Sequence, residues 1–435
     1  MNFKNSKTKT SALFFSFVLL LVTGCNTTSR SLNQPILVGP TEPEVKAAAL
    51  DKYVANLQQS THFLDVAVPT FDPGFPMTKD GKEIDYSELD EEGIWPQLRR
   101  TEAKLFAVET KNALEKSAAF SSVRVVPNAN TSADIFVLGR VLESTSEEVG
   151  FELTVVTAAG EVLGKKDFEH KVDENFFKDQ RNAGKNPYQP VYDKGRDYVL
   201  SLLSQLSDAE KKEIKDIATI RYARYYSPEA YSQYISTEVK RKAGQSYYEF
   251  SLNGIPADDD MNFKRIKDLQ AQEMLFVDRL QDNYDTFYAE TNDAYRTWQE
   301  ETLPEIIAYR EAKFDRNVKA GLGIGLAVLA GILASNEGNS GSSLGRGATT
   351  AGAVLAGVGS AITINEAFKS NSELKVQSAI IEEKGQAVDL SVSPTEMKFE
   401  DQIVELNGTA SEQYLQWKQH LREMYEIEKT PDVQL

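Results

Sequence analysis

Leu64-Asp65-Val66-Ala67-Val68-Pro69 is the stretch that decides the fold. Its apolar residues alternate with others and include β-branched valines, which is typical of a half-buried strand. Pro96 then marks the first turn of a long helix. We expect this helix to bury one apolar face and to carry its basic residues elsewhere. The apolar face holds Leu98, Leu105, Val108 and Leu114, and the basic residues are Arg99, Arg100, Lys104 and Lys111.

Four more strands are predicted after this helix. They cover Val123–Pro127 and residues 134–142, 151–157 and 162–169. The last two are joined by a tight turn at Ala158-Ala159-Gly160-Glu161. The order strand, helix, strand and three-stranded meander predicts an α+β fold, an open sandwich with the helix on one face of the sheet. A mainly helical region with a glycine-rich apolar hairpin is expected to follow.

Two resemblances to known proteins can be stated. The order of elements over residues 64–169 resembles the periplasmic domain of outer-membrane lipoproteins of the curli-secretion type and of lipoprotein activators of penicillin-binding proteins. In its actual residues the chain is more similar to an uncharacterised family of proteobacterial outer-membrane lipoproteins. That resemblance implies a location and an architecture, and it brings no catalytic residues. It is carried by Ala133–Val141, Asn186–Tyr188, Tyr226–Tyr231 and Gly254–Asp260.

Leu21-Val22-Thr23-Gly24-Cys25 has the pattern of a lipobox. It follows a basic start and an apolar run over residues 12–22, the two parts of a secretory signal. The pattern resembles that of bacterial lipoproteins, which implies cleavage before Cys25 and acylation, by palmitate or a similar chain, at its sulfur and new amino terminus. Asn26, which is not Asp, implies sorting to the outer membrane, facing the periplasm. The alternative is an ordinary secreted protein in which Cys25, the only cysteine, occurs by chance.

Length and charge limit the classes of function. A chain of 435 residues is long enough for two or three domains. Its formal charge is −17, and removal of residues 1–24, which carry three lysines and no acid, makes it −20. Such a surface repels phosphate, so nucleic acid and anionic lipid headgroups are poor partners. His62, His170 and His420 are not at ligand spacing, so we expect no metal or cofactor.

Residues 198–318 are expected to be mostly helical. An aromatic and aliphatic row spaced by three, four and seven residues predicts a helix that packs against other helices, with a ligand-binding face as the less common reading. Pro304 must kink or restart this helix. The row consists of Ile266, Leu269, Phe276, Leu280, Tyr284, Phe287, Tyr295 and Trp298.

Two uncharged apolar runs, residues 320–334 and 348–365, flank a polar glycine- and serine-rich loop and predict a hairpin. Small residues four apart allow helix backbones to approach closely, as in a glycine zipper. They are Gly321, Gly325, Gly352, Ala356, Gly357 and Ala361. The first run would span roughly 22 Å, less than the ~30 Å of a hydrocarbon core. The hairpin is therefore either buried between helices or subunits, or inserted in a thin membrane.

The C-terminal segment is polar again. A strand or extended pair is expected near Gln386–Val392 and Gln402–Leu406. Thr409 with Glu412 predicts a capping box for a last helix. The chain thus divides into a signal peptide at 1–24, a tether and short helix at 25–60, an α+β domain at 61–197, a helical region at 198–318, the apolar hairpin at 319–368 and a strand and helix segment at 369–435.

No catalytic constellation is evident in the sequence, which has no nucleophile elbow and no phosphate-cradling glycine loop. We therefore expect a lipid-anchored envelope protein that acts by binding and is not an enzyme. The first hypothesis is a structural or assembly component that forms an oligomer with itself. The second is a regulator that docks onto a periplasmic enzyme, and the third is a glycan hydrolase that uses two of the 65 carboxylates.

Overall fold

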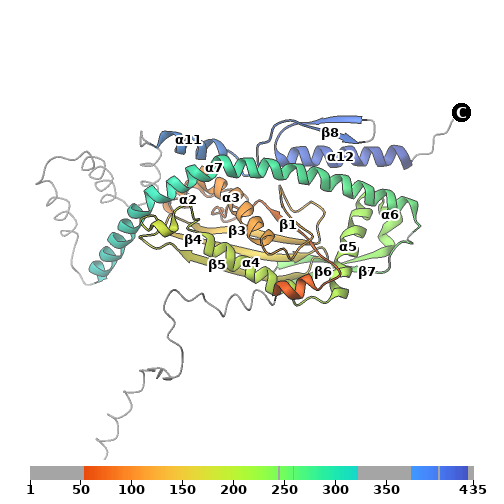
Figure 1. Cartoon of the computed structure of the whole chain (residues 1–435), viewed down its shortest axis with the longest axis horizontal. Helices are drawn as coiled ribbons and strands as arrows, with labels where there is room; N and C mark the ends of the chain where they lie inside the picture. The colour runs from red at the N-terminus through yellow and green to blue at the C-terminus, as the bar shows by residue number, and fades with distance from the viewer. Residues whose placement is uncertain (1–52, 243–244, 258, 322–373, 400–401, 430–435) are drawn as a thin grey trace, which may run out of the picture. The chain divides into compact units, whose positions relative to one another are not determined.

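The computed structural model describes residues 53–242, 245–257, 259–321, 374–399 and 402–429 (Figure 1). The elements up to the fifth strand are β1 (Asp65–Pro69), α2 (Tyr86–Glu91), α3 (Pro96–Glu115), β2 (Ser122–Val126), β3 (Ile135–Ser144), β4 (Glu148–Thr157) and β5 (Val162–Lys171). The elements after it are η1 (Gln180–Asn182), α4 (Gln189–Leu203), α5 (Asp208–Tyr226), α6 (Pro228–Tyr231), η2 (Ser232–Tyr234), β6 (Ile235–Lys242), β7 (Gln245–Leu252), α7 (Met261–Gly321), α11 (Lys375–Lys384), β8 (Thr395–Phe399), β9 (Gln402–Leu406) and α12 (Ala410–Lys429).

The sheet has five strands in the order β2-β1-β3-β4-β5. β1 pairs in parallel with both β2 and β3, and β3, β4 and β5 form an antiparallel meander. Because β2 is parallel to β1, the chain must cross over between them, and α3 makes this crossover. The predicted α+β fold, with a five-stranded N-terminal sheet and a helical region after it, is confirmed.

The helices α3 and α4 cover one face of the sheet. Phe151 of β4 lies at the centre of this layer, with its ring centroid 6.3 Å from that of Phe106 of α3 and 5.7 Å from that of Tyr192 of α4. All three rings are buried. Burial of aromatic side chains of this size is a main source of stability in such a layer.

The expectation that α3 buries one apolar face is wrong, because most of its residues are buried, three basic ones included. Arg99, Lys104 and Lys111 are each at most 9% exposed, and α7 and α11 pack against α3 (Figure 1). The Lys104 ammonium donates to the carbonyl oxygens of Lys384 and Ala387, both at 2.6 Å. An interior lysine is therefore part of the contact between α3 and the chain that follows α11.

Residues 198–318 are mostly helical, as expected, but the sequence did not predict the β6–β7 hairpin among them, whose alternating Ile235, Thr237 and Val239 pair with β7. One expectation for secondary structure is wrong. The strand expected at 386–392 does not form, and only Ser391 makes an isolated bridge, to Thr409. Carbonyl groups at the start of that stretch accept hydrogen bonds from Arg100 and Lys104 of α3, so they are not available to a neighbouring strand.

The other C-terminal expectations are confirmed. The strand predicted at Gln402–Leu406 is β9, paired with β8. The capping box of α12 is present, since the Thr409 amide donates to the Glu412 carboxylate at 2.8 Å and the Glu412 amide donates to the Thr409 hydroxyl. The aromatic row of α7 is core, because all eight of its side chains are buried. Pro304 lies inside α7, which continues beyond it to Gly321.

Several predicted positions lie outside the described residues. Gly321 is the last residue of α7, whereas Cys25, Gly325, Gly352, Ala356, Gly357 and Ala361 fall in the undescribed ranges. Within the described ranges, no helix combines the length and the apolar character that a membrane crossing requires.

Candidate functional site

A groove of about 780 Å³ lies on the face of the sheet opposite α3 and α4. Its floor includes Phe136 and Leu138 of β3 and Val156 of β4. These side chains alternate along the strands with the buried residues of the other face, so they point away from the α3 layer. Five more segments complete the groove: the loop 129–133, the turn between β4 and β5, α5, strand β7 of the β6–β7 hairpin and the first turns of α12.

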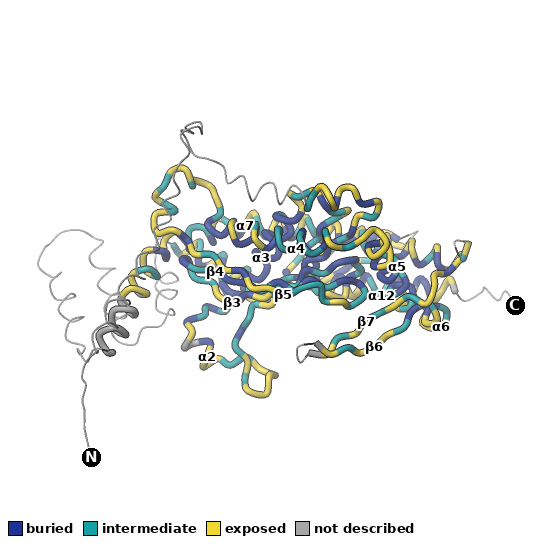
Figure 2. Tube along the Cα trace, turned by 90° about the horizontal axis from the view of Figure 1, so that it is seen from below, coloured by how far each residue is buried: buried dark blue, intermediate teal, exposed yellow. Residues whose placement is uncertain are grey.

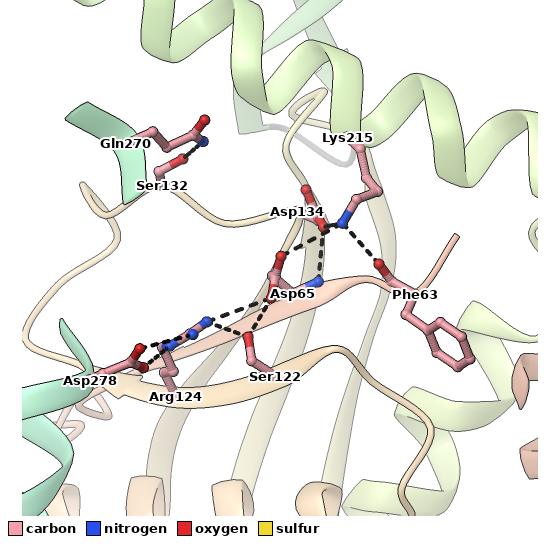
Figure 3. A network of polar contacts seen from close by, with 9 residues as sticks. All are labelled: Phe63, Asp65, Ser122, Arg124, Ser132, Asp134, Lys215, Gln270 and Asp278. Atoms are coloured by element: carbon pink, nitrogen blue, oxygen red, sulfur yellow. Dashed lines mark hydrogen bonds and ion pairs between the residues drawn. The ribbon is translucent and has the colours of Figure 1, made fainter. Parts of the chain in front are cut away.

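The wall formed by α5 is fixed to the sheet through Lys215 (Figure 3). Its ammonium donates to the Asp134 carboxylate and to the Phe63 carbonyl oxygen, both at 2.8 Å. Burial raises the pKa of the Asp134 carboxyl, and the charge of Lys215 opposes that rise. The network continues through Asp65 to Arg124, which pairs with Asp278 of α7. Two helices are thus tied to the amino-terminal ends of the parallel strands.

The wall formed by the hairpin is fixed at the turn between β4 and β5. The Phe250 amide donates to the Ala159 carbonyl oxygen at 2.8 Å. Gly160 follows with a φ of +79°, and its backbone lies against the Tyr248 carbonyl. Figure 2 shows that the hairpin extends from this point with mostly exposed and half-exposed residues. The base of the hairpin is held while its strands border the groove.

The third wall brings together α12 and the loop before β3. Tyr414 of α12 donates to the Glu273 carboxylate of α7 at 2.6 Å and to the Asn130 carbonyl oxygen at 3.2 Å. Ser132 of the same loop accepts from Gln270 of α7 at 2.7 Å (Figure 3). These contacts hold α12 and the loop against α7.

Three cations line the groove, and each lies over an aromatic ring. The Arg221 guanidinium is 4.0 Å from the centroid of the Phe250 ring, and that of Arg224 is 5.4 Å from the same ring. The Lys418 ammonium is 4.6 Å from the Tyr225 ring. Burial lowers the pKa of Arg221, and the neighbouring charge of Arg224 lowers it further. The two guanidinium groups therefore repel each other at this wall.

Two other buried carboxylates, Glu102 and Glu109, do not line this groove. Glu102, 1% exposed, pairs with Arg99 at 3.2 Å and accepts from the hydroxyls of Ser144 and Tyr295. Burial raises its pKa. Glu109 accepts from Asn186 at 2.7 Å and from Tyr288 at 2.8 Å. Glu102 is closed off from solvent, whereas Glu109 borders a second groove of about 720 Å³ together with Asn186 and Tyr288.

The segments that carry the family resemblance can each be placed in the fold. Ala133–Val141 forms the first seven residues of β3 and the two residues before it, and three of its side chains line the groove. Asn186 forms a turn, accepting from the Tyr188 amide at 2.8 Å. Asp260 accepts from the Phe263 amide at 2.9 Å in the first turn of α7. Pro228 begins α6.

None of the site residues predicted from the sequence lines the groove. The lipidation site and most of the glycine positions lie outside the described residues, and Gly321 ends α7. The cations of the groove were missed because Lys418 is almost 200 positions from Arg221 and Arg224 along the chain. The Ala243-Gly244 pair between two alternating runs is the local signal that would have located the hairpin.

Within the described ranges, no group of three or more His, Cys, Asp or Glu side chains has the arrangement to hold a metal ion. Comparison with protein-family models, with curated proteins and with solved structures found no match to this chain. The resemblances drawn from the sequence therefore stay predictions.

Proposed function

We propose that this protein is anchored by lipid at Cys25 in the outer membrane, faces the periplasm, and acts by binding a ligand in the groove. The observation that carries the binding role is the groove itself, whose volume is in the range of small-molecule sites. It combines apolar residues of the sheet face with a few polar groups on rigid elements, which is typical of binding sites. The lipobox residues support the anchor.

The anchor is tested by Cys25→Ser. The sulfur of Cys25 is the only thiol in the chain, so the variant should incorporate no fatty acid and should keep its signal peptide. Metabolic labelling with palmitate in a Gram-negative host measures the first, and the mass of the purified protein measures the second. Normal labelling or processing of the variant would show that the lipoprotein assignment is wrong.

The groove is tested by photo-crosslinking from α12. A photoreactive residue replaces Leu415, which lines the groove and is 53% exposed, in the full-length protein in its host envelope. The matched control places it at Ile427, which is 64% exposed on the same helix and does not line the groove. We expect adducts at Leu415 that the control lacks. Equal or absent adducts at both positions would refute the groove as the binding site.

Self-association through residues 319–368 remains the second candidate role. It is supported by the small residues four apart in that segment. Docking onto a periplasmic enzyme is compatible with the same groove if the bound group belongs to a protein. The crosslinking experiment tests docking, because a docked protein gives adducts at Leu415. Self-association through residues 319–368 is tested separately, by substitution within that segment.

A further inference from the structure

The side chains that line the groove carry a positive charge, whereas the protein as a whole is negative. The chain has 65 Asp and Glu against 48 Lys and Arg, yet among the described residues that line the groove there are three cations and no carboxylate. A random patch of this surface would carry more acids than bases. A site of the opposite sign attracts anions against the field of the rest of the molecule.

The cations have neutral hydrogen-bond partners. Arg221 donates to the Ala158 carbonyl oxygen at 2.5 Å, Arg224 to the Thr237 hydroxyl at 3.1 Å, and Lys418 to the Asn130 carbonyl oxygen at 3.1 Å. In the described part of the chain, none of the three pairs with a carboxylate. A guanidinium has five donors in a fixed fork, so donors remain for a phosphate or carboxylate.

The same groove exposes large apolar side chains. Tyr225 is 40% exposed, Tyr248 64% and Leu415 53%, and all three line it. They come from α5, β7 and α12, which the fold brings together. Exposed apolar groups gathered in one concave site are typical of a binding surface. A ligand that fits must therefore have an apolar or aromatic part next to its charge.

We propose that the groove binds a soluble small molecule in which a phosphate or carboxylate group is attached to an apolar or aromatic body. The anionic group lies between Arg221, Arg224 and Lys418, and the apolar body lies against Tyr225, Tyr248 and Leu415. A soluble ligand, and not a membrane surface, is the occupant, because the net negative charge of the protein repels anionic bilayers. This inference rests on the proposed binding function and names its ligand class.

The test uses the full-length lipidated protein in nanodiscs of phosphatidylcholine and isothermal titration calorimetry. Phenyl phosphate is the probe, and inorganic phosphate and phenol supply its two halves separately. We expect phenyl phosphate to bind about tenfold more tightly than either half. Arg224→Gln should weaken it by about tenfold, since one charge-assisted hydrogen bond is lost. Tyr248→Ala, at an exposed position, should weaken phenyl phosphate and leave inorganic phosphate unchanged.

The matched control is Lys212→Gln, which removes a positive charge from the same helix at a solvent-exposed pair with Asp216. Binding of phenyl phosphate by this variant should equal that of the parent protein. Loss in Lys212→Gln equal to that in Arg224→Gln would overturn the proposal, because only net charge would then matter. Binding to phosphatidylglycerol vesicles but not to phenyl phosphate would overturn the soluble ligand. If no probe binds while the Leu415 crosslinker still captures a molecule, the proposed binding function stands and this ligand class is wrong.

Discussion

Gly160, in the turn between β4 and β5, lies so close to Tyr248 of the hairpin that a Cβ atom added to it would be 1.8 Å from the Tyr248 carbonyl oxygen. No side chain fits in this space. The contact joins the sheet to the β6–β7 hairpin and so determines the width of the groove at one wall.

Gly160→Ala should therefore release the hairpin from the sheet. The added methyl group clashes with backbone, and the φ of +79° strains any L residue, so we expect a loss of at least about 2 kcal/mol in the free energy of unfolding. The amide of Phe250, which donates to Ala159, should exchange its hydrogen faster. The control is Gly81→Ala, where φ is +70° and no atom lies within 4 Å of the added methyl group, so only the strain of about 1 kcal/mol applies. Equal effects of the two substitutions would contradict the contact.

Lys215→Met should destabilise the attachment of α5. It leaves the Asp134 carboxylate, 7% exposed, without its cation, and we expect a loss of about 2 kcal/mol in urea unfolding. Adding Asp134→Asn should recover part of the loss, because no charge is then left buried. Lys212→Met removes an exposed pair on the same helix and should cost less than about 1 kcal/mol. A loss as large as that of Lys215→Met would argue against the network of Figure 3.

Lys104 should make stability rise with pH above neutrality. Burial lowers its folded-state pKa to about 8, against 10.5 for an ordinary lysine. Between these values the unfolded chain binds more protons at this site than the folded one, so the free energy of unfolding increases as pH rises, by up to about 3 kcal/mol. The measurement is the difference between the parent protein and Lys104→Met at pH 7 and pH 10.5. A difference that does not change with pH would contradict the buried charge.

Gly325→Leu tests the segment that lies outside the described residues. If small residues four apart permit close helix contact, a bulky one separates the backbones and weakens self-association or membrane retention. Light scattering of the solubilised protein measures its mass, and Val328→Leu, at a position that is not small, is the control. A form without residues 1–25 separates retention by lipid from retention by the hairpin. If that form is a soluble monomer with or without the substitution, the hairpin is internal core.

The sequence by itself determined the elements whose signals are local. The strand at Asp65–Pro69, the proline at the start of α3 and the Thr409–Glu412 capping box each depend on residues within a single element. The strand is present, but the prediction that it is half-buried is wrong, because Val66–Pro69 are all buried. The apolar row of α7 was likewise correctly assigned to the core, because its spacing follows the helix. Such patterns report which side of an element is buried, but they do not identify what buries it.

The formation of the groove and the burial of Lys104 depend on the tertiary structure alone. Lys104 lies off the apolar face of α3, and it is buried because residues 280 and 283 positions later supply the carbonyl groups it needs. Arg221 and Lys418 lie in one groove although 197 positions separate them. The physical reason is that side-chain periodicity acts over one or two turns, whereas contact between distant segments depends on how whole elements pack. The charge of the chain is a sum over all its residues, and it does not report a local site of the opposite sign.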